Sequence, residues 1–303
     1  MHAASPDRVS PKDTRTPSAS AMWLRAIAMT SAAMLLASCD EGVLDPHGPV
    51  GKAERIILYN STAIMLAVVI PVIVLTLVFA WWFRARNKRA HYRPDWEYSG
   101  RIEMIIWSIP ALVVLFLGGI AWTGSHDLDP AVPLEESSAP LDIEVISVDW
   151  RWLFIYPHEG IASLNRLVVP ARVPLRFRLT STTVMNSFFV PQLGTQIYTM
   201  PNMVTRLNLE ADQPGTFEGL SAQFSGDGFS DMRFDLVSTD TDAFKDWVNT
   251  TKTQGGVLDA RTFEELARPA KADGVRTYAQ VSQGLFDSVS SGHMAAVSPQ
   301  RGQ

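Results

Sequence analysis

Two uninterrupted apolar stretches dominate the pattern of hydrophobic and polar positions in this chain of 303 residues. Residues 63–83 and 104–122 each contain one polar side chain. At about 1.5 Å of rise per residue, each stretch is long enough to cross the ~30 Å hydrocarbon core of a membrane. The pattern therefore predicts two transmembrane helices, which we place at residues 56–83 and 102–124.

The segment between these helices is strongly basic. Residues 84–101 hold six Lys or Arg among 18 positions. Positive charge concentrated in a short loop is typical of the cytoplasmic side of a membrane. We therefore expect this basic loop to face the cytoplasm. Residues 40–55 and those from 123 onward are then expected to face the periplasm.

The amino terminus has the pattern of a secretory signal. Arg25 precedes an apolar stretch at residues 27–36, and small residues follow immediately before Cys39. A positive charge, an apolar segment and a small-residue cleavage site in this order are typical of a signal peptide. We expect residues 1–38 to be removed, with Met22 as an alternative start.

Cys39 is the only cysteine of the chain, so neither an intramolecular disulfide nor a site of several thiolates can form within it. The Leu-Ala-Ser sequence before it resembles a bacterial lipobox, which implies lipidation of Cys39. Asp40 matches a signal for inner-membrane retention in the Gram-negative lipoproteins that this segment resembles. The alternative is an ordinary signal peptide that ends beside a chance cysteine.

From Leu141 onward the apolar period changes to two, which is typical of strands. Pro and Gly turns separate the apolar runs, and no helical pattern intervenes. A change of phase at Val145–Ile146 predicts a bulge in the first strand or a strand that changes partners there. The whole pattern predicts an antiparallel β-sandwich or barrel of about 100 residues. We expect its strands at residues 141–152, 166–169, 175–179, 188–190, 205–209 and 234–237.

Two short helices are predicted after the sandwich, at residues 240–248 and 259–268. Each opens on an Asp that can cap free backbone amides, and Pro269 follows the second. Aromatic residues are scattered through this region. Residues 291–303 have no such pattern and are expected to be disordered.

Several features together resemble subunit II of the haem-copper oxidases. They are the two predicted spans, the Trp-rich strand Asp149-Trp150-Arg151-Trp152 and a final hairpin that ends at Met232. The resemblance implies a periplasmic domain with an all-β, cupredoxin-like sandwich fold. In the cytochrome c oxidase branch of that family, this domain binds a binuclear copper centre. Its ligands come from a His-Ser-Phe stretch and a Cys-x-Glu-x-Cys-x-x-x-His-x-x-Met loop.

The copper ligands of that branch are replaced in this sequence. Hydroxyl, amide and phenyl groups cannot take the place of the thiolates and imidazoles that a soft redox metal needs. Between residues 141 and 250 there is no Cys and one His, His158, so the inventory alone excludes a copper or zinc electron-transfer site. The lost ligand positions are Asn186, Ser221, Gln223, Ser225 and Phe229, and Met232 alone is retained, where we expect a core residue.

The motifs fit the quinol-oxidase branch of the family, most closely subunit II of the cytochrome bo type ubiquinol oxidases. The matching segments are residues 185–189, 194–198, 214–217 and 224–229. The resemblance implies a non-redox subunit of a proton-pumping terminal oxidase that oxidises ubiquinol and reduces O2 to water. This chain would bind no cofactor, because haems, copper and the quinol site belong to the large subunit I. Small membrane subunits III and IV would complete the complex.

Glu103 and two tryptophans are further candidates for a role. Glu103 stands at the cytoplasmic end of the second span, where a carboxylate either complements the helix dipole or feeds protons into the membrane. The resemblance implies the second role, at the entrance of a proton channel. Trp150 and Trp152 lie where copper-bearing relatives receive electrons from cytochrome c. Without copper, we expect both to have core or interface roles.

Other functions remain open at this point. A free-standing inner-membrane lipoprotein, whose sandwich binds a ligand or senses a signal, would have the same topology, because a sandwich does not define a function. A cytochrome c oxidase subunit would need the copper ligands that this chain lacks. The net charge of −5 gives no reason to expect nucleic acid as a partner.

The predicted protein is thus a multi-pass protein of the bacterial inner membrane, with a lipid anchor and its main domain in the periplasm. Its expected segments are a signal peptide (1–38), a lipidated periplasmic N-terminus (39–55), the first helix (56–83), a basic cytoplasmic loop (84–101), the second helix (102–124), a linker (125–140), a cupredoxin-like domain without copper (141–238), an aromatic-containing helical extension (239–290) and a disordered tail (291–303).

Overall fold

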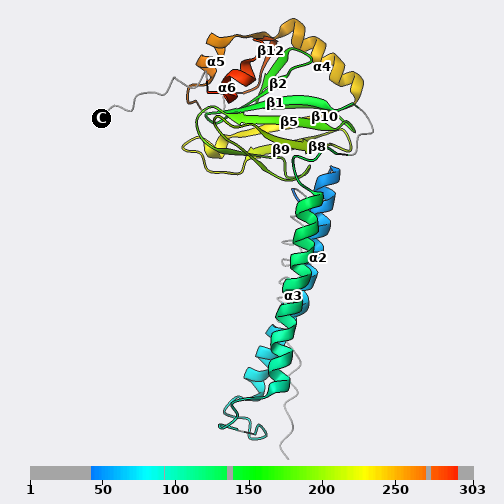
Figure 1. Ribbon diagram of the computed structural model, residues 1–303, viewed down its shortest axis with the longest axis vertical. Coiled ribbons are helices and arrows are strands. Elements are labelled where there is room, and N and C mark those ends of the chain that lie inside the picture. Colours follow the sequence, from blue (N-terminus) through cyan, green and yellow to red (C-terminus); the bar gives the residue numbers. More distant parts are fainter. Residues whose placement is uncertain (1–41, 92, 135–138, 271–273, 293–303) are drawn as a thin grey trace, which may run out of the picture. The chain divides into compact units, whose positions relative to one another are not determined.

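The computed structural model describes residues 42–91, 93–134, 139–270 and 274–292. The expectations for the signal peptide, for Cys39 and Asp40, and for residues 293–303 fall outside these residues. The described chain consists of a helical hairpin, a β-sandwich and short C-terminal helices (Figure 1). The predicted fold class is therefore confirmed.

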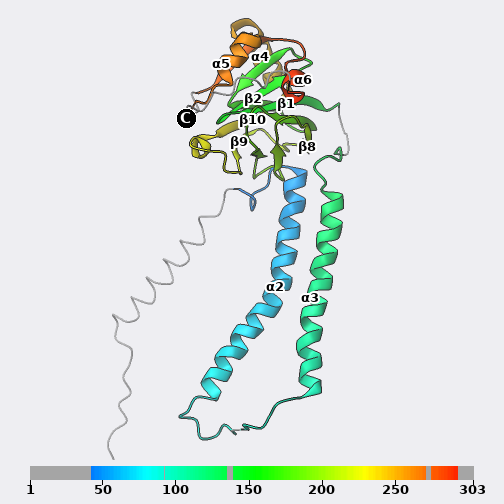
Figure 2. The ribbon, with the colours of Figure 1, turned by 60° about the vertical axis from the view of Figure 1, so that its left-hand side comes forward.

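The hairpin consists of α2 (Pro49–Trp82) and α3 (Gly100–Asp127), which lie side by side in both ribbon views (Figures 1 and 2). Both are long and apolar enough to cross a membrane. Polar residues extend α2 beyond its predicted start and α3 beyond both of its predicted limits. In α2, Thr76 Oγ1 donates to the carbonyl of Val72 at 2.7 Å, and Ser108 makes the equivalent bond in α3 at 2.6 Å. The polar side chain of each span is thus satisfied within its own helix, as a bilayer requires.

α2 contains Pro71. Proline lacks the amide hydrogen that would bond the carbonyl four residues earlier, and its ring crowds that turn, so it bends a helix. Figure 2 shows such a bend partway along α2.

Two sheets form the sandwich. The larger contains β1 (Leu141–Val148), β2 (Arg151–Tyr156), β3 (Ile161–Leu164), β5 (Leu175–Ser181), β8 (Thr205–Leu209), β11 (Gly256–Leu258) and β12 (Arg276–Val281), in the order β11-β12-β3-β2-β1-β5-β8. The smaller contains β4 (Arg166–Pro170), β6 (Asn186–Phe189), β7 (Ile197–Thr199), β9 (Gly215–Ser221) and β10 (Arg233–Thr239), in the order β4-β10-β9-β6-β7.

Both sheets are mixed, so the expectation of purely antiparallel strands is wrong. β1 pairs in parallel with β5, β4 with β10, and β11 with β12. A tight hairpin cannot join parallel neighbours. Each of these pairs is separated in the chain by other elements, which carry the backbone out of the pair and back.

The first predicted strand is in fact two strands. β1 ends at Val148 and β2 begins at Arg151, so Asp149 and Trp150 form the two-residue turn of an antiparallel hairpin. Neither predicted cause of the phase change at Val145–Ile146, a bulge or a change of partners, is correct, because the pairing of β1 with β2 and with β5 is continuous there. The change in phase of the apolar pattern has another cause.

That cause is burial on both faces. Every residue of β2 is buried. Its even-numbered residues belong to the core between the two sheets, whereas Leu153 and Ile155 belong to a second core on the other side of the larger sheet. Ile146 and Val148 of β1 belong to the same second core. A strand that is covered on both faces has apolar residues on both, so it lacks the alternation of apolar and polar residues that is typical of a strand with one solvent-exposed face.

The second core is closed by α5 (Ala260–Leu266), α6 (Leu285–Ser290) and the strands β11 and β12 of the C-terminal region. The remaining helix of this region, α4 (Thr241–Gln254), instead packs Phe244 and Val248 against the core between the sheets. Asp240 and Asp259 cap α4 and α5 as the sequence predicted, with Oδ1 accepting from Ala243 N and Thr262 N, each at 2.8 Å. The strands were not predicted. They extend the larger sheet beyond β3, so the C-terminal region belongs to the same sheet as the sandwich.

Arg151 connects this C-terminal region to the β1–β2 hairpin through hydrogen bonds. The residue is only 4% exposed, and its Nη2 donates to the carbonyls of Leu266 at 2.5 Å and Arg268 at 2.8 Å. These carbonyls lie at the C-terminal end of α5, where a helix leaves acceptors without partners and favours a positive charge. The guanidinium therefore acts as a cap supplied from a distant strand.

Candidate functional site

Two of the predicted ligand positions lie together inside the sandwich. Asn186 opens β6 and Ser221 closes β9, and these strands are neighbours. The Ser221 hydroxyl donates to Asn186 Oδ1 at 3.3 Å, and Asn186 Nδ2 donates to Ser147 Oγ at 3.3 Å. Ser147 in turn shares a 2.8 Å hydrogen bond with Thr199. All four side chains are buried, so the site is held by neutral hydrogen bonds.

The remaining positions are spread along the loop between β9 and β10. Gln223 and Ser225 are half-buried, and among the described residues the buried Ser225 hydroxyl has no hydrogen-bond partner. Phe229 begins a short 3-10 helix, and its ring lies 5.6 Å from that of the exposed Phe224. Met232 is 1% exposed and packs in the core between the sheets.

Trp150 closes this loop from the side of the β1–β2 hairpin. Its Nε1 donates to the carbonyl of Ser225 at 3.2 Å. Its ring lies directly on Gly228, where an added Cβ would be 2.3 Å from ring atom Cδ2. Gly226, beside the same ring, has a φ of +115°. The loop therefore needs glycine at 228 for close approach and at 226 for its backbone conformation.

The backbone of Trp150 is strained. Its φ is +65°, in the left-handed region that bulky residues avoid at a cost on the order of 1–3 kcal/mol. The contacts of its indole with the loop hold it there. Trp152 differs, because its fully buried ring packs edge-on against Phe188 at 5.4 Å and Phe234 at 5.7 Å. One tryptophan thus closes the loop and the other fills the core.

The donor set at this site is unsuited to a transition metal. Amide, hydroxyl, phenyl and buried thioether groups provide neither thiolate nor imidazole. Within residues 42–91, 93–134, 139–270 and 274–292, no three His, Cys, Asp or Glu side chains gather as a metal-holding group. The arrangement therefore has a structural role, because it closes one end of the sandwich with packing and neutral hydrogen bonds.

Glu103 lies far along the chain from this loop, in the first turn of α3, and is exposed. Its backbone amide donates to the carbonyl of Ser99 at 3.0 Å, which belongs to the start of the helix. A carboxylate here complements the N-terminal end of the helix dipole. Its role in proton entry stays a prediction.

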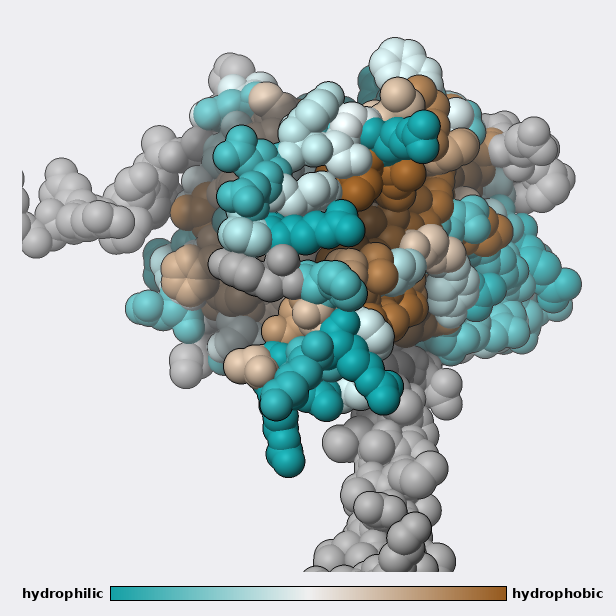
Figure 3. All heavy atoms as spheres, turned by 90° about the horizontal axis from the view of Figure 1, so that it is seen from below, coloured by the Kyte–Doolittle hydropathy of each residue, from teal (hydrophilic) through white to brown (hydrophobic). Residues whose placement is uncertain are grey.

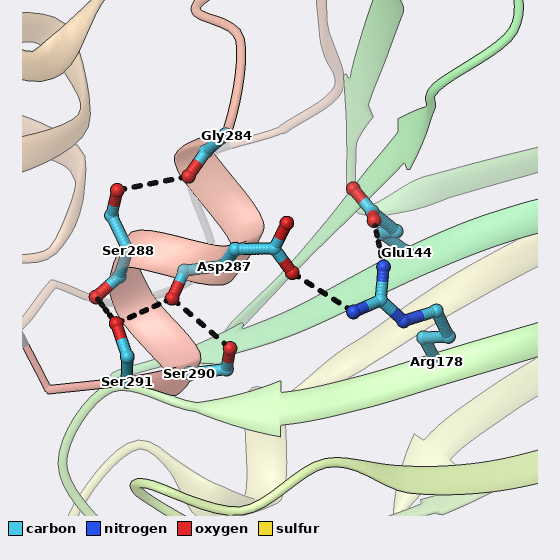
Figure 4. A network of polar contacts seen from close by, with 7 residues as sticks. All are labelled: Glu144, Arg178, Gly284, Asp287, Ser288, Ser290 and Ser291. Carbon is cyan, nitrogen blue, oxygen red and sulfur yellow. Dashed lines mark hydrogen bonds and ion pairs between the residues drawn. The ribbon is translucent and has the colours of Figure 1, made fainter.

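A polar cluster that sequence analysis missed joins α6 to the larger sheet (Figure 4). Arg178 of β5 donates to Glu144 of β1 at 2.7 Å and to Asp287 of α6 at 2.9 Å, and its guanidinium lies 4.7 Å from the centre of the Phe286 ring. Burial raises the pKa of Glu144, an effect that Arg178 opposes. Glu144 and Asp287 are 34 and 109 positions from Arg178 in the sequence, so no local pattern predicts the cluster.

Comparison with known proteins agrees with this arrangement. Residues 143–238 match the family described as cytochrome c oxidase subunit II, periplasmic domain, and residues 252–294 match the COX aromatic rich motif. The sandwich and the region that covers its second core therefore define a protein of the oxidase subunit II class.

Similar full-length proteins narrow this class. The chain is 44% identical to cytochrome bo(3) ubiquinol oxidase subunit 2 of Pseudomonas aeruginosa, over 90% of this chain and 81% of that protein. It is 46% identical to ubiquinol oxidase subunit 2 of Acetobacter aceti, over 86% and 85%. It is 33% identical to quinol oxidase subunit 2 of Bacillus cereus, over 82% and 87%. The chain belongs to the family of ubiquinol oxidase subunit 2.

Proposed function

We propose that this chain is the non-redox subunit II of a terminal ubiquinol oxidase, which oxidises ubiquinol, reduces O2 to water and moves protons outward. The observation that carries the proposal is the donor set at the former ligand positions. Asn186 and Ser221 are hydrogen-bonded to each other, and the loop is closed by Trp150. Electrons from a cytochrome c would find no acceptor in this chain, and the names of its relatives support a quinol as the reductant.

In the proposed complex, haems, copper and the quinol site belong to subunit I, with subunits III and IV beside it. The most apolar windows of α2 and α3 contain no buried residue, which supports their contact with lipid and with partner helices. The protein is proposed to lie in the inner membrane with its sandwich in the periplasm and its basic loop in the cytoplasm. Cys39 would carry the lipid anchor, and Asp40 would retain the protein in that membrane.

Gentle detergent purification of the tagged chain tests this proposal. We expect the chain to migrate with a haem-containing complex of several subunits that oxidises ubiquinol. We also expect the copper content of that complex to equal the amount that the large subunit binds, because this chain is expected to bind none. A haem-free monomer would support the alternative, a free-standing lipoprotein with a ligand-binding or sensing sandwich.

Proton entry at Glu103 is tested separately in the assembled complex. We expect Glu103→Gln to lower O2 consumption and proton uptake several-fold, because the amide cannot accept and release a proton. Glu97→Gln is the matched control, since it removes the same charge from the adjoining loop, and we expect it to change neither rate. Unchanged rates in Glu103→Gln, in a complex of normal haem content, would contradict the role.

A further inference from the structure

The loop between α2 and α3 carries more positive charge than its hydrogen bonds to the end of α2 require. It carries six Lys or Arg but only two acidic residues, Asp95 and Glu97. Two of its polar side chains serve the end of α2: Arg84 Nη1 donates to the carbonyl of Trp81 at 3.2 Å, and Asn87 Nδ2 donates to that of Trp82 at 2.6 Å. The carbonyls of Trp81 and Trp82 at the helix end are thereby satisfied without the other basic residues.

The structure shows no acidic partner for these other cations within the part of the chain that it describes. Among the described residues of the loop, no carboxylate lies within ion-pair distance of Arg93, Arg101 or the basic side chains at 86, 88 and 89. Seen from the end of the hairpin that carries this loop, hydrophilic side chains gather in front of apolar surface (Figure 3). The loop therefore presents unneutralised positive charge beside the apolar helices.

An open hollow gives this charge a defined site. It has a volume of about 370 Å³ and is lined by Phe83, His91, Arg93 and Trp96. No acidic residue lines it, whereas Asp95 lines a second hollow of about 400 Å³, which shares Arg93 and Trp96 with the first. An anion is therefore favoured in the first hollow, where Arg93 and the ring N–H of His91 can donate to its oxygens.

The remaining two lining residues indicate what carries the anion. Phe83 and Trp96 are 59% and 57% exposed, and they bring apolar ring surface to the same hollow as the cation. The loop joins two helices that span a membrane, so the hollow lies at the membrane surface, where Trp is favoured and basic clusters attract anionic lipids. An inorganic phosphate ion would gain nothing from the rings.

We propose that this hollow binds the headgroup of an anionic phospholipid, with its phosphate on Arg93 and His91 and its glycerol and upper acyl chain against Phe83 and Trp96. The proposal rests on the membrane topology of the proposed function. It does not depend on which reductant the complex uses.

Native mass spectrometry of the full chain in detergent tests the proposal. The chain is supplied with phosphatidylglycerol or phosphatidylcholine of identical acyl chains, and the retained lipids are counted. We expect phosphatidylglycerol to be retained in preference, and Arg93→Gln to lower its retention about tenfold, because the charge-assisted hydrogen bond to the phosphate is lost. Lys88→Gln removes the same charge from the loop but not from the hollow, and we expect a less than twofold change.

Three outcomes would overturn the proposal. Equal losses in Arg93→Gln and Lys88→Gln would show diffuse attraction without a site. Equal retention of the two lipids would show that the headgroup charge is not recognised. Displacement of phosphatidylglycerol by millimolar inorganic phosphate would assign the hollow to a free anion. None of these outcomes bears on whether the chain purifies with a haem-containing complex, so the proposed function is tested independently.

Discussion

Arg151→Met lowers the free energy of unfolding of the periplasmic domain by about 3 kcal/mol, because the buried carbonyl of Leu266 and the part-buried carbonyl of Arg268 lose their donor. Methionine keeps most of the side-chain length, so the change removes the hydrogen bonds to Leu266 and Arg268 and leaves a smaller packing defect. The C-terminal region should detach first. We expect limited proteolysis to cleave it faster in the variant than in the parent chain.

Arg261→Met is the matched control for this prediction. Arg261 lies on the same short helix, its side chain is 87% exposed, and it forms an ion pair with Glu265 at 3.6 Å. An exposed ion pair of this kind contributes at most about 1 kcal/mol, so the control should unfold almost as the parent does in a denaturant titration. Similar losses in both variants would show that the cap at α5 contributes nothing specific.

The second large effect is expected at Gly228. Alanine there would place its Cβ 2.3 to 2.6 Å from three ring atoms of Trp150, which is also bonded to the loop through Ser225. We expect a loss of about 2 kcal/mol in the free energy of unfolding, within the range for overpacking. The φ of Gly228 is −98°, which any residue adopts, so the whole effect is steric.

A double-mutant cycle isolates this contact. In a Trp150→Ala background, Gly228→Ala should cost almost nothing, because the ring that it would strike is gone. Gly256→Ala serves as the control glycine, since its added Cβ would meet only the ring of Tyr278 in the adjacent strand, at an ordinary 3.7 Å. An equal cost of Gly228→Ala with and without Trp150 would refute the contact.

The parts of the fold that could be predicted are those with a local signal. Long apolar stretches indicate α2 and α3, and Asp240 and Asp259 mark the starts of their helices because capping involves neighbouring residues. The strands β11 and β12 have three and six residues and depend on partners far along the chain, so their sequences carry little pattern. The same holds for Arg151, whose acceptors are 115 and 117 residues away.

The candidate site could be predicted in its chemistry but not in its construction. Residue types alone exclude thiolate and imidazole ligands at the former metal positions. They do not reveal that Asn186 and Ser221 bond each other, that the Ser225 hydroxyl has no hydrogen-bond partner among the described residues, or that Phe229 packs against Phe224. Trp150 was placed in a strand, because its alternation with Trp152 hides a turn whose φ of +65° only tertiary contacts maintain.

The closure of this loop by Trp150 has a consequence for how the subunit matures. A metal-binding loop reaches its final shape only when its ion arrives, and its thiolates must stay reduced until then. Here neutral hydrogen bonds and an indole ring complete the shape from the chain's own atoms, and the chain has a single cysteine, Cys39, outside the domain. The domain should therefore fold directly on reaching the periplasm, without a copper chaperone or a thiol reductant.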